Sequence, residues 1–501
     1  MLVQLQQASA SFRPVPTPPP AGPEKRMKDI HLVSLIDASE EVIEPLAVAC
    51  VENLESARSN SPSQLTGAVF VQRSGTSPGA KKMKATLASV VPRAVGFGLG
   101  VAAGSYLVGG LVGAGIGGAV GLAVGSTVAN RLFGRTQLLA HIPDNGSEPF
   151  WKGSRTYELG ENRSDAIDSK IVAEDPGARQ LDPKAMGTFL GTEMAAHPDK
   201  MAVAHVFGHG LAYRQAAGLQ FTAYREMLSQ ATTLAGRPVD LLLVESCLCG
   251  NLESLLATAP FARYAVVSEE VVSAGAISHA FSKAVGAAAG HEVTPGQLGQ
   301  AVVRSNPETG VRDLFSFFFG LPPSKDEISL DDTPEQMVKK TTAETLALVD
   351  LGQVEALGQA VDRLGGVLSQ EVRDGLAPAI QAASEEAIHT GGDPMLVVAK
   401  RSLAVGDLNV FVNCLAEIYA SGVPSQRPRE VLTALGEVSR QLQKTVVEAS
   451  ISPQFADSAG LTIQLPSRDL TVIDGQHSER LSGSAAPPNW KEFVRLASSA
   501  M

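Results

Sequence analysis

The sequence predicts an α/β protein. We expect a mostly parallel sheet flanked by helices, with an inserted glycine-rich helical hairpin and a mainly helical C-terminal region. Two stretches, 30–72 and 203–247, predict the sheet, because each reads as a strand, a helix and a second strand. After about residue 330 successive helical patterns replace this alternation. With 501 residues, 44% of them hydrophobic, the chain is long enough for two or three domains.

The N-terminal part predicts a tail followed by the first unit of the sheet. Residues 1–27 are rich in Gln, Ser and Pro, which is typical of a disordered segment. They lack the pattern of a secretory signal peptide, which favours a cytoplasmic or membrane-associated protein; an export signal of another kind remains an alternative. The predicted sheet domain, residues 28–325, begins with a strand at 30–36, a helix across 42–54 and a strand at 67–72.

A glycine-rich segment, residues 85–133, interrupts this domain. No residue from Ala94 to Asn130 is charged, and two runs of glycines recur at every fourth position. This spacing lets membrane helices pack closely, and one span needs about 20 residues, so two short spans fit. Basic residues on both sides place both ends in the cytoplasm. We therefore expect contact with a lipid bilayer through 94–130; a soluble hairpin packed on the protein or on a second copy is the alternative.

The residues suited to catalysis follow two strands of the second unit. The strand at 203–207 runs into a Gly-His-Gly turn at His209, and the strand at 241–244 runs into Glu-Ser-Cys, which ends at Cys247. Parallel neighbours end at the same edge of a sheet, where open α/β folds bind ligands. We expect His209 and Cys247 to lie side by side there, where an imidazole can activate a thiol. The alternative is an inert core cysteine and a simple turn.

Other residues compete with these two. Cys249 is a second thiol, but Cys247 directly follows the apolar strand. His205 lies inside its strand and is predicted to be a core histidine, and Cys50 lies on the apolar face of its helix. Four cysteines do not make a disulfide framework in a chain of this length. Because neither C-x-x-C nor H-E-x-x-H occurs, the sequence predicts no metal site and no cofactor.

The remaining elements are predicted from apolar spacing and turn residues. We expect polar loops or short hairpins at 147–183, a helix at 183–196, a helix at 221–228, a helix at 251–258, a strand at 264–268 and a helix at 274–289. The C-terminal region, residues 326–501, predicts helices at 345–364, 372–388, 407–419 and 429–449, a strand at 460–466 and a closing segment at 490–493.

At these motifs the chain resembles the clostripain-like cysteine peptidases, which are relatives of the caspases. That family has a strand ending in His-Gly, then Asp-Ala-Cys-Leu-Met-Gly, a Glu-Leu helix and a strand ending in Ser-Gln-Glu. The corresponding segments here are Gly208-His209-Gly210, Glu245-Ser246-Cys247-Leu248-Cys249-Gly250, Glu253-Ser254-Leu255 and Ser268-Glu269-Glu270. The sequence departs from the family at Glu245, Cys249 and Glu269. The resemblance covers about 28–80 and 135–495, including the C-terminal Asp-Leu-x-x-Phe and Trp-x-x-Phe motifs.

The resemblance implies a caspase-like fold and a His209/Cys247 dyad in a cysteine endopeptidase. We expect the amides of Gly210 and Cys247 to bind the oxyanion, because glycine permits close backbone approach. In the family the acid two residues before the cysteine binds a basic P1 side chain, so Glu245 implies cleavage after Arg or Lys; a carboxylate that caps the following helix is the alternative. Glu269 is a candidate for further substrate contact, or a solvated rim residue. A calcium requirement rests on the resemblance alone.

Partners follow from charge and from this specificity. The net charge of −11 without a basic stripe excludes nucleic acid as a partner, and the expected substrate is a polypeptide. Cleavage after basic residues makes six arginines candidate self-cleavage sites: Arg93, Arg131, Arg135, Arg214, Arg225 and Arg237. The alternative function is a membrane-inserting or pore-forming glycine-zipper effector on an inactive peptidase scaffold.

Overall fold

The computed structural model describes residues 26–38, 44–73, 151–163, 167–178, 181–270, 272, 275–306, 345–389, 400, 403–452, 455–467 and 485–500. The predicted tail, the predicted hairpin and three candidate cleavage sites (Arg93, Arg131 and Arg135) lie outside these residues. Within the described ranges, no helix combines the length and the apolar character that crossing a membrane requires.

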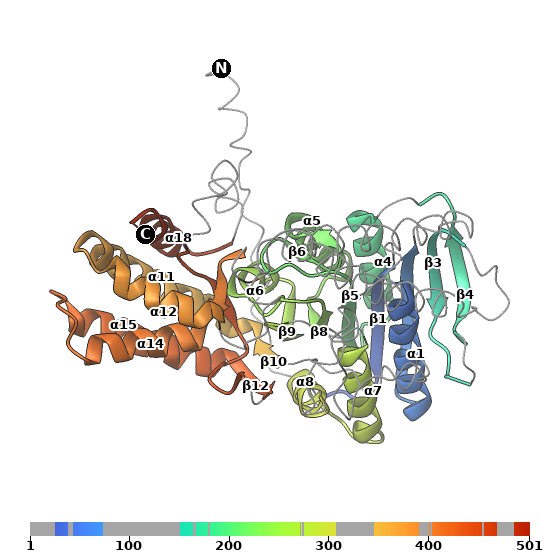
Figure 1. The fold of residues 1–501 in the computed structure, drawn as a ribbon. Coiled ribbons are helices and arrows are strands. Elements are labelled where there is room, and N and C mark those ends of the chain that lie inside the picture. The colour runs from blue at the N-terminus through green and yellow to red at the C-terminus, as the bar shows by residue number, and fades with distance from the viewer. Residues whose placement is uncertain are drawn as a thin grey trace, which may run out of the picture.

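A nine-stranded sheet with the order β12-β10-β9-β8-β5-β1-β2-β3-β4 forms the centre of the molecule (Figure 1). Its five middle strands are parallel: β9 (Ala262–Val267), β8 (Val239–Glu245), β5 (Met201–Phe207), β1 (Ile30–Ala38) and β2 (Leu65–Arg73). Antiparallel pairs extend both edges: β10 (Thr345–Asp350) with β12 (Val446–Ile451), and β3 (Gly153–Glu158) with β4 (Lys170–Asp175). The predicted α/β class with a mostly parallel central sheet is confirmed.

Helices cover both faces of the sheet, so the parallel strands are buried on two sides. One face packs against α1 (Glu44–Asn60), α7 (Ala276–Ala288) and α8 (Pro295–Arg304). The other packs against α4 (Pro183–Ala196), α5 (Phe221–Ala235) and α6 (Leu252–Thr258). Successive strand residues alternate between these two cores, as the pleat requires: Leu32 and Ile36 belong to the first core, Val33 and Leu35 to the second.

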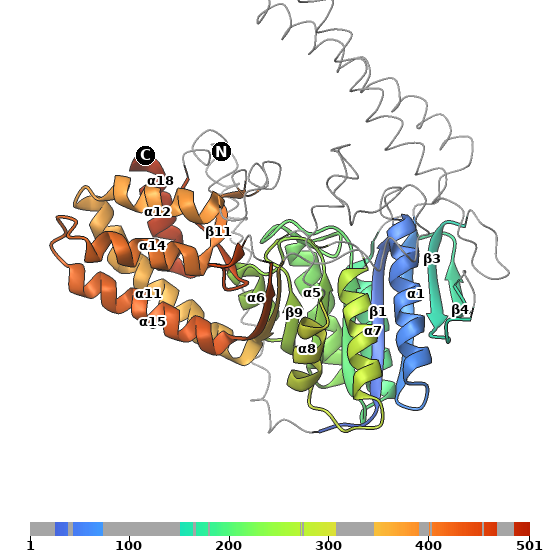
Figure 2. The same cartoon turned by 60° about the horizontal axis from the view of Figure 1, so that its bottom comes forward.

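The C-terminal helices gather beyond the β12 edge of the sheet (Figure 2). They are α11 (Val354–Arg373), α12 (Ala377–His389), α14 (Leu408–Ala420), α15 (Pro428–Thr445) and α18 (Pro488–Ala500). Trp490 anchors α18 in this group, because its buried ring contacts Phe411 and Phe493 and its indole N–H donates to the carbonyl of Gln464 at 2.8 Å. A small sheet pairs β11 (Val405–Asp407) with β13 (Thr462–Gln464); β11 contacts α12, and β13 contacts α6 beside the central sheet.

Two boundaries predicted for the C-terminal region are wrong. The segment 345–350, predicted as the start of a helix, is strand β10, and 446–449, predicted as the end of one, belongs to β12. A short apolar run such as Thr-Leu-Ala-Leu-Val fits a buried strand as well as a buried helix, and here pairing with β9 decides the outcome. The C-terminal region therefore contributes two strands to the same sheet that carries the predicted dyad.

Candidate active site

The two turns that carry the predicted dyad lie against each other at the carboxyl ends of the parallel strands β5 and β8. In the β5–β8 pair, Phe207 is opposite Glu245, so both strands end at the same level. A Cβ atom built on Gly210 would lie 2.2 Å from the carbonyl oxygen of Cys247 and 2.7 Å from its amide nitrogen. Only a residue without a side chain permits this approach. The structure thus brings the peptide that follows His209 into contact with Cys247.

Hydrogen bonds fix the loop after His209 against the loop that carries Cys247. The amide of Gly218 donates to the carbonyl of His209 at 2.9 Å, and the amide of Ala217 donates to the Ser246 hydroxyl at 3.1 Å. A short hairpin, β6 (Gln215–Ala216) and β7 (Leu219–Gln220), closes the loop. His209 is exposed and Cys247 is half-buried, so both are within reach of solvent at this edge.

Backbone strain is concentrated in the segments that meet here. Four non-glycine residues in the described part of the chain have positive φ: Ala212, Ala217, Leu248 and Ala404. The first two follow His209, Leu248 follows Cys247, and Ala404 lies in the C-terminal segment that packs against Leu248. Such conformations persist only where the surroundings enforce them, and they cluster at active sites. This cluster is a second observation, beside the Gly210 contact, that favours the His209 and Cys247 turns as a candidate site.

Burial raises the pKa of Cys247, which favours the protonated thiol at neutral pH. The Sγ atom lies 3.9 Å from the carbonyl of Val272, to which a protonated thiol donates. Burial also raises the pKa of Cys249, whose side chain lies in the core. Cys247 is thus the accessible thiol of the two, and its activation requires a base at the moment of attack.

We predict that the alkylation rate of Cys247 by iodoacetamide is slow at pH 7 and rises with pH beyond the ordinary thiol range. The reason is that a raised pKa keeps the thiolate fraction small, and that fraction increases about tenfold per pH unit below the pKa. Peptide-level mass spectrometry would follow Cys247, with half-buried Cys414 as an internal reference. A rate that is already maximal at pH 6 would contradict this prediction, because it would reveal a preformed thiolate–imidazolium pair.

Beneath the two turns lies a buried polar group that includes Glu245. The carboxylate accepts from His205 Nε2 at 2.9 Å and from the Ser278 amide at 3.1 Å, and His205 Nδ1 lies 2.8 Å from the Ser34 hydroxyl. His205 is therefore a core histidine, as predicted. The second oxygen of Glu245, Oε1, is buried and has no N–H or O–H partner in the described part of the chain, while the Cys50 thiol is a further neighbour of this carboxylate. Binding of a basic P1 side chain by Glu245 stays a prediction.

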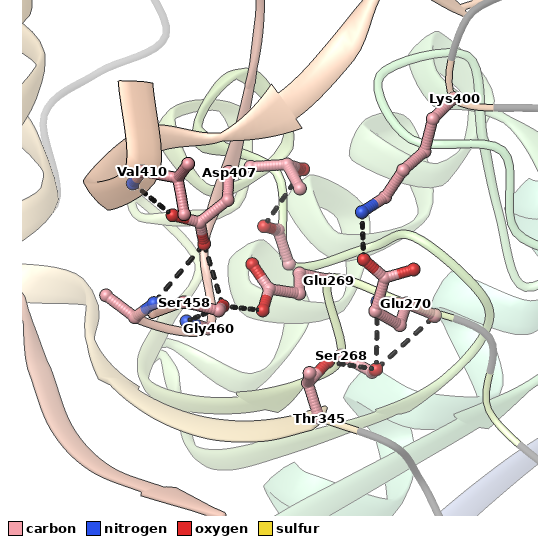
Figure 3. Close-up of polar contacts among 12 residues, drawn as sticks. Ser268, Glu269, Glu270, Thr345, Lys400, Asp407, Val410, Ser458 and Gly460 are labelled. Atoms are coloured by element: carbon pink, nitrogen blue, oxygen red, sulfur yellow. Dashed lines mark hydrogen bonds and ion pairs between the residues drawn. The ribbon is translucent and has the colours of Figure 1, made fainter. Parts of the chain in front are cut away.

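Glu269 and its neighbour Glu270 lie in the interior, where they contact the C-terminal segment (Figure 3). The expectation of a solvated rim is therefore wrong. The ammonium group of Lys400 forms an ion pair with Glu270, and both residues are buried. The carbonyl of Glu270 accepts from the amide of Leu248 at 2.9 Å, next to Cys247. Lys400, from the C-terminal segment, therefore pairs with the residue whose carbonyl holds Leu248, and Leu248 is the sequence neighbour of Cys247.

Glu269 and Asp407 are two buried carboxyl groups that meet at the Ser458 hydroxyl (Figure 3). Burial, with the neighbouring Asp407 carboxylate, raises the pKa of Glu269 well above its ordinary value. The Ser458 hydroxyl lies 2.7 Å from Asp407 Oδ2 and also contacts Glu269. Asp407 also accepts from the amides of Val410 and Ala459. Protonated Glu269 therefore donates to Ser458, which donates to Asp407, without two facing charges.

Gly210→Ala is expected to lower activity about 100-fold, because the new methyl group would displace the Cys247 peptide and a misplacement of about 1 Å costs on this order. The matched control is Gly436→Ala on α15, where an added Cβ meets nothing within 4 Å. Hydrolysis rates at equal folded fractions provide the measurement. Full activity of Gly210→Ala would show that the contact has no role in catalysis.

The three candidate cleavage sites that the structure describes differ in setting. Arg214 lies in the loop after His209, with its guanidinium 5.7 Å from the Tyr213 ring centroid. Arg225 is inside helix α5. Arg237 precedes β8, at the edge opposite Cys247, and donates to the carbonyls of His197 and Lys200. Of the three, Arg214 is the one next to the candidate site.

No protein-family model matches the sequence, and no curated protein matches it. Solved structures do resemble the fold. One is a secreted C11 cysteine protease from Bacteroides thetaiotaomicron in complex with an irreversible peptide inhibitor; it has a TM-score of 0.47 and 11% identity, and the likeness covers 94% of this chain and 98% of that one.

Two further structures are similar to this chain. An inactive zymogen C11 protease from Parabacteroides distasonis has a TM-score of 0.45 and 8% identity, covering 94% of this chain and 99% of that one. A clostripain from Bacteroides thetaiotaomicron in complex with a peptide inhibitor has a TM-score of 0.26 and 15% identity, covering 57% and 99%.

Proposed function

We propose that this protein is a cysteine endopeptidase in which Cys247 is the nucleophile and His209 the general base. The observation that carries the proposal is the contact between the Gly210 and Cys247 peptides at the carboxyl ends of two parallel strands. This contact brings the turn that carries His209 next to the accessible thiol of Cys247. The residues with positive φ lie in the same segments. A structural cysteine needs neither the close approach nor the strain.

The proposed reaction proceeds in two stages. The Cys247 sulfur attacks the carbonyl carbon of the scissile peptide while its proton passes to His209. The amides of Gly210 and Cys247 stabilise the oxyanion, and their proximity supports this pairing because a Cβ on Gly210 would lie 2.7 Å from the Cys247 nitrogen. Breakdown of the intermediate releases the amine, which takes the proton from His209, and leaves a thioester. Water, deprotonated by His209, then hydrolyses the thioester and regenerates the thiol.

For specificity we propose a basic P1 residue recognised by Glu245. Among the described residues, one buried oxygen of this carboxylate has no N–H or O–H donor, and a guanidinium or ammonium group would supply one in place of the weakly donating Cys50 thiol beside it. His205 and the Ser278 amide hold the other oxygen, which fixes the orientation of the carboxylate. This arrangement supports an electrostatic subsite beneath Cys247.

The test compares fluorogenic peptides that differ only in having Arg, Lys, norleucine or Asp at P1. The wild-type protein is expected to hydrolyse the Arg and Lys peptides and to leave the Asp peptide intact. If none of the peptides is cleaved under reducing conditions, with or without calcium, peptidase activity is excluded for this chain.

Glu245→Gln is expected to reduce the preference for Arg over norleucine about 100-fold, because loss of a buried hydrogen-bonded charge pair costs about 2–5 kcal/mol. The kcat/KM ratio of the two peptides provides the measurement, and this ratio is independent of the amount of folded enzyme. An unchanged ratio, with activity retained, would remove Glu245 from the subsite while the peptidase assignment stands.

We further propose membrane tethering through residues 94–130, and self-cleavage after one of the named arginines. The uncharged run and the glycine spacing support the first proposal, and the position of Arg214 beside the site supports the second. Flotation with liposomes tests tethering, and leakage of their contents without hydrolysis would favour the alternative effector function. Gel analysis of wild-type and Cys247→Ala protein tests self-cleavage, which would be excluded by equally intact chains.

A further inference from the structure

Three side chains of metal-ligating type lie together at the amino ends of the parallel strands, whereas Cys247 follows the carboxyl end of β8. His31 is near the start of β1, where it pairs with Thr66 and Ala202 at the beginning of the neighbouring strands. Glu193 belongs to the last turn of α4, and His197 directly follows that helix. Their ligand atoms all lie within 4.8 Å of one another, and no other trio in the described residues meets this criterion.

The three side chains are arranged around a common point. His31 Nε2 lies 3.1 Å from Glu193 Oε2, and the rings of His31 and His197 have centroids 3.9 Å apart. Glu193 and His197 are four positions apart, which places them on one side of the helix end. The His31 side chain is buried, whereas the side chain of Glu193 is 29% exposed, so the group is open to solvent on one side.

Hydrogen bonds determine which nitrogen of His31 faces the group. The Thr66 hydroxyl accepts from Lys200 Nζ at 2.9 Å and donates to the carbonyl of Ile30 at 3.5 Å. Its second lone pair therefore accepts from His31 Nδ1, which lies 3.0 Å away and carries the proton. Nε2 is then the ring nitrogen that faces the Glu193 carboxylate and is the one placed to bind a metal ion.

We propose that His31, Glu193 and His197 bind a zinc-class divalent metal ion. Two imidazoles and one carboxylate are a common ligand set for zinc with one position open to water, whereas calcium and magnesium prefer oxygen ligands. Zinc bonds of about 2.0–2.2 Å place tetrahedral ligand atoms about 3.4 Å from one another. Small side-chain rotations are therefore enough to bring the three ligand atoms to this separation. The Thr66 contact to Nδ1 is the outer partner that metal-bound histidines usually have.

The proposed ion would join α4 to the start of β1 and stabilise the fold. It lies at the strand edge opposite Cys247, so we expect it to leave peptide hydrolysis unchanged. This separates the metal proposal from the proposed function, because either one can fail without the other.

The test uses full-length protein carrying Cys247→Ala, so that the accessible thiol does not compete for metal. After treatment with a chelator, the protein is titrated calorimetrically with Zn²⁺, and spectroscopically with Co²⁺, whose absorption distinguishes nitrogen and oxygen ligands from sulfur. We expect His197→Asn and Glu193→Gln to weaken Zn²⁺ binding at least about 100-fold, since loss of an outer partner alone costs about 10–100-fold. Zn²⁺ should raise the thermal midpoint of the parent more than that of either variant.

The matched control is His389→Asn on α12. Glu385 and His389 repeat the four-residue spacing at a helix end, but they are not part of the trio of candidate ligands. Zn²⁺ affinity should be unchanged in this variant. The proposal is overturned if the parent binds no Zn²⁺, if His197→Asn binds it as tightly as the parent, or if Co²⁺ shows sulfur ligation. In these cases a proton on His31, forming an ion pair with Glu193, accounts for the geometry.

Discussion

Cys247→Ala is expected to lower kcat for hydrolysis of an Arg peptide by at least about 10⁴-fold, the scale seen when a nucleophile is removed from a hydrolase. The loss should be in the chemical step, because the substitution removes the sulfur that forms the thioester while the surrounding backbone stays in place. Cys247 is half-buried, so a small side chain at this position leaves little cavity and the free energy of unfolding should change little.

Cys249→Ala is the matched control, since it removes a thiol two residues away. The Cys249 side chain packs in the core, with its sulfur 3.9 Å from the carbonyl of Gln215. We expect a modest loss of stability and activity within a few-fold of wild type. Steady-state kinetics at a temperature where all variants are folded provide the comparison. Should Cys249→Ala be the inactive variant and Cys247→Ala the active one, the assignment of the nucleophile is reversed.

The same logic separates the two histidines. His209→Ala is expected to lower kcat strongly with little effect on unfolding, because His209 is exposed. His205→Asn should instead destabilise the protein, because it disrupts the buried contacts to Ser34 and Glu245. A general base and a core histidine thus give opposite combinations of kinetic and thermodynamic effects.

The sequence was sufficient to predict how the dyad turns are placed. The strands before His209 and Cys247 are short apolar runs, interrupted in the first only by His205, and the helix between them favours parallel pairing within one unit. Parallel pairing then brings both turns to one edge, and Gly210 signals the close backbone approach that the structure contains. Local pattern and local connection determine this part of the fold, so no distant information was needed.

The surroundings of Glu269 and Glu270 were not predictable in this way. Two adjacent glutamates after a strand look like solvated residues, because burial of a charge is rare without a partner. The partners come from far along the chain: Lys400 pairs with Glu270, and Ser458 contacts Glu269. Single-sequence periodicity carries no signal for such pairs. The helix that begins beside Asp407 was predicted at 407–419, but the contact of Asp407 with Ser458 was not.

The metal-ligating trio shows the same limit. Metal-site patterns such as C-x-x-C and H-E-x-x-H place ligands close together in sequence, whereas His31 is 162 residues from Glu193. Only the packing of α4 beside β1 brings them together. Likewise, the apolar run at 345–349 has no periodicity that separates strand from helix, and its two antiparallel partners determine the strand.

Lys400→Met is expected to lower the free energy of unfolding by about 3–5 kcal/mol, which is the typical cost of removing one partner from a buried ion pair. Lys400 and Glu270 are both buried, and the Lys400 ammonium group forms an ion pair with the Glu270 carboxylate. Burial lowers the pKa of Lys400, but the neighbouring acidic groups, with Glu270 first among them, outweigh it and raise the pKa above its ordinary value, so the ammonium form persists at neutral pH. The variant leaves a negative charge in the interior.

Urea unfolding of Lys400→Met, Lys400→Met with Glu270→Gln, and Lys444→Met would measure this effect. The double variant should recover most of the lost stability, because it removes the uncompensated charge along with the ammonium group. Lys444 is exposed at the end of α15, so its replacement should change the free energy by less than about 0.5 kcal/mol. Equal stability of Lys400→Met and Lys444→Met would show that the ion pair contributes nothing.

Activity should fall in Lys400→Met even where the protein remains folded. Glu270 holds the amide of Leu248 through its backbone carbonyl, and Leu248 has φ of 59° directly after Cys247. The Leu248 side chain packs against Leu403 and Phe455 from the C-terminal region. Because a strained backbone persists only while its surroundings enforce it, loosening Glu270 releases the peptide that positions the thiol. A kcat that falls well below the folded fraction, and recovers in the double variant, would show that the C-terminal region supports the nucleophile as well as the fold.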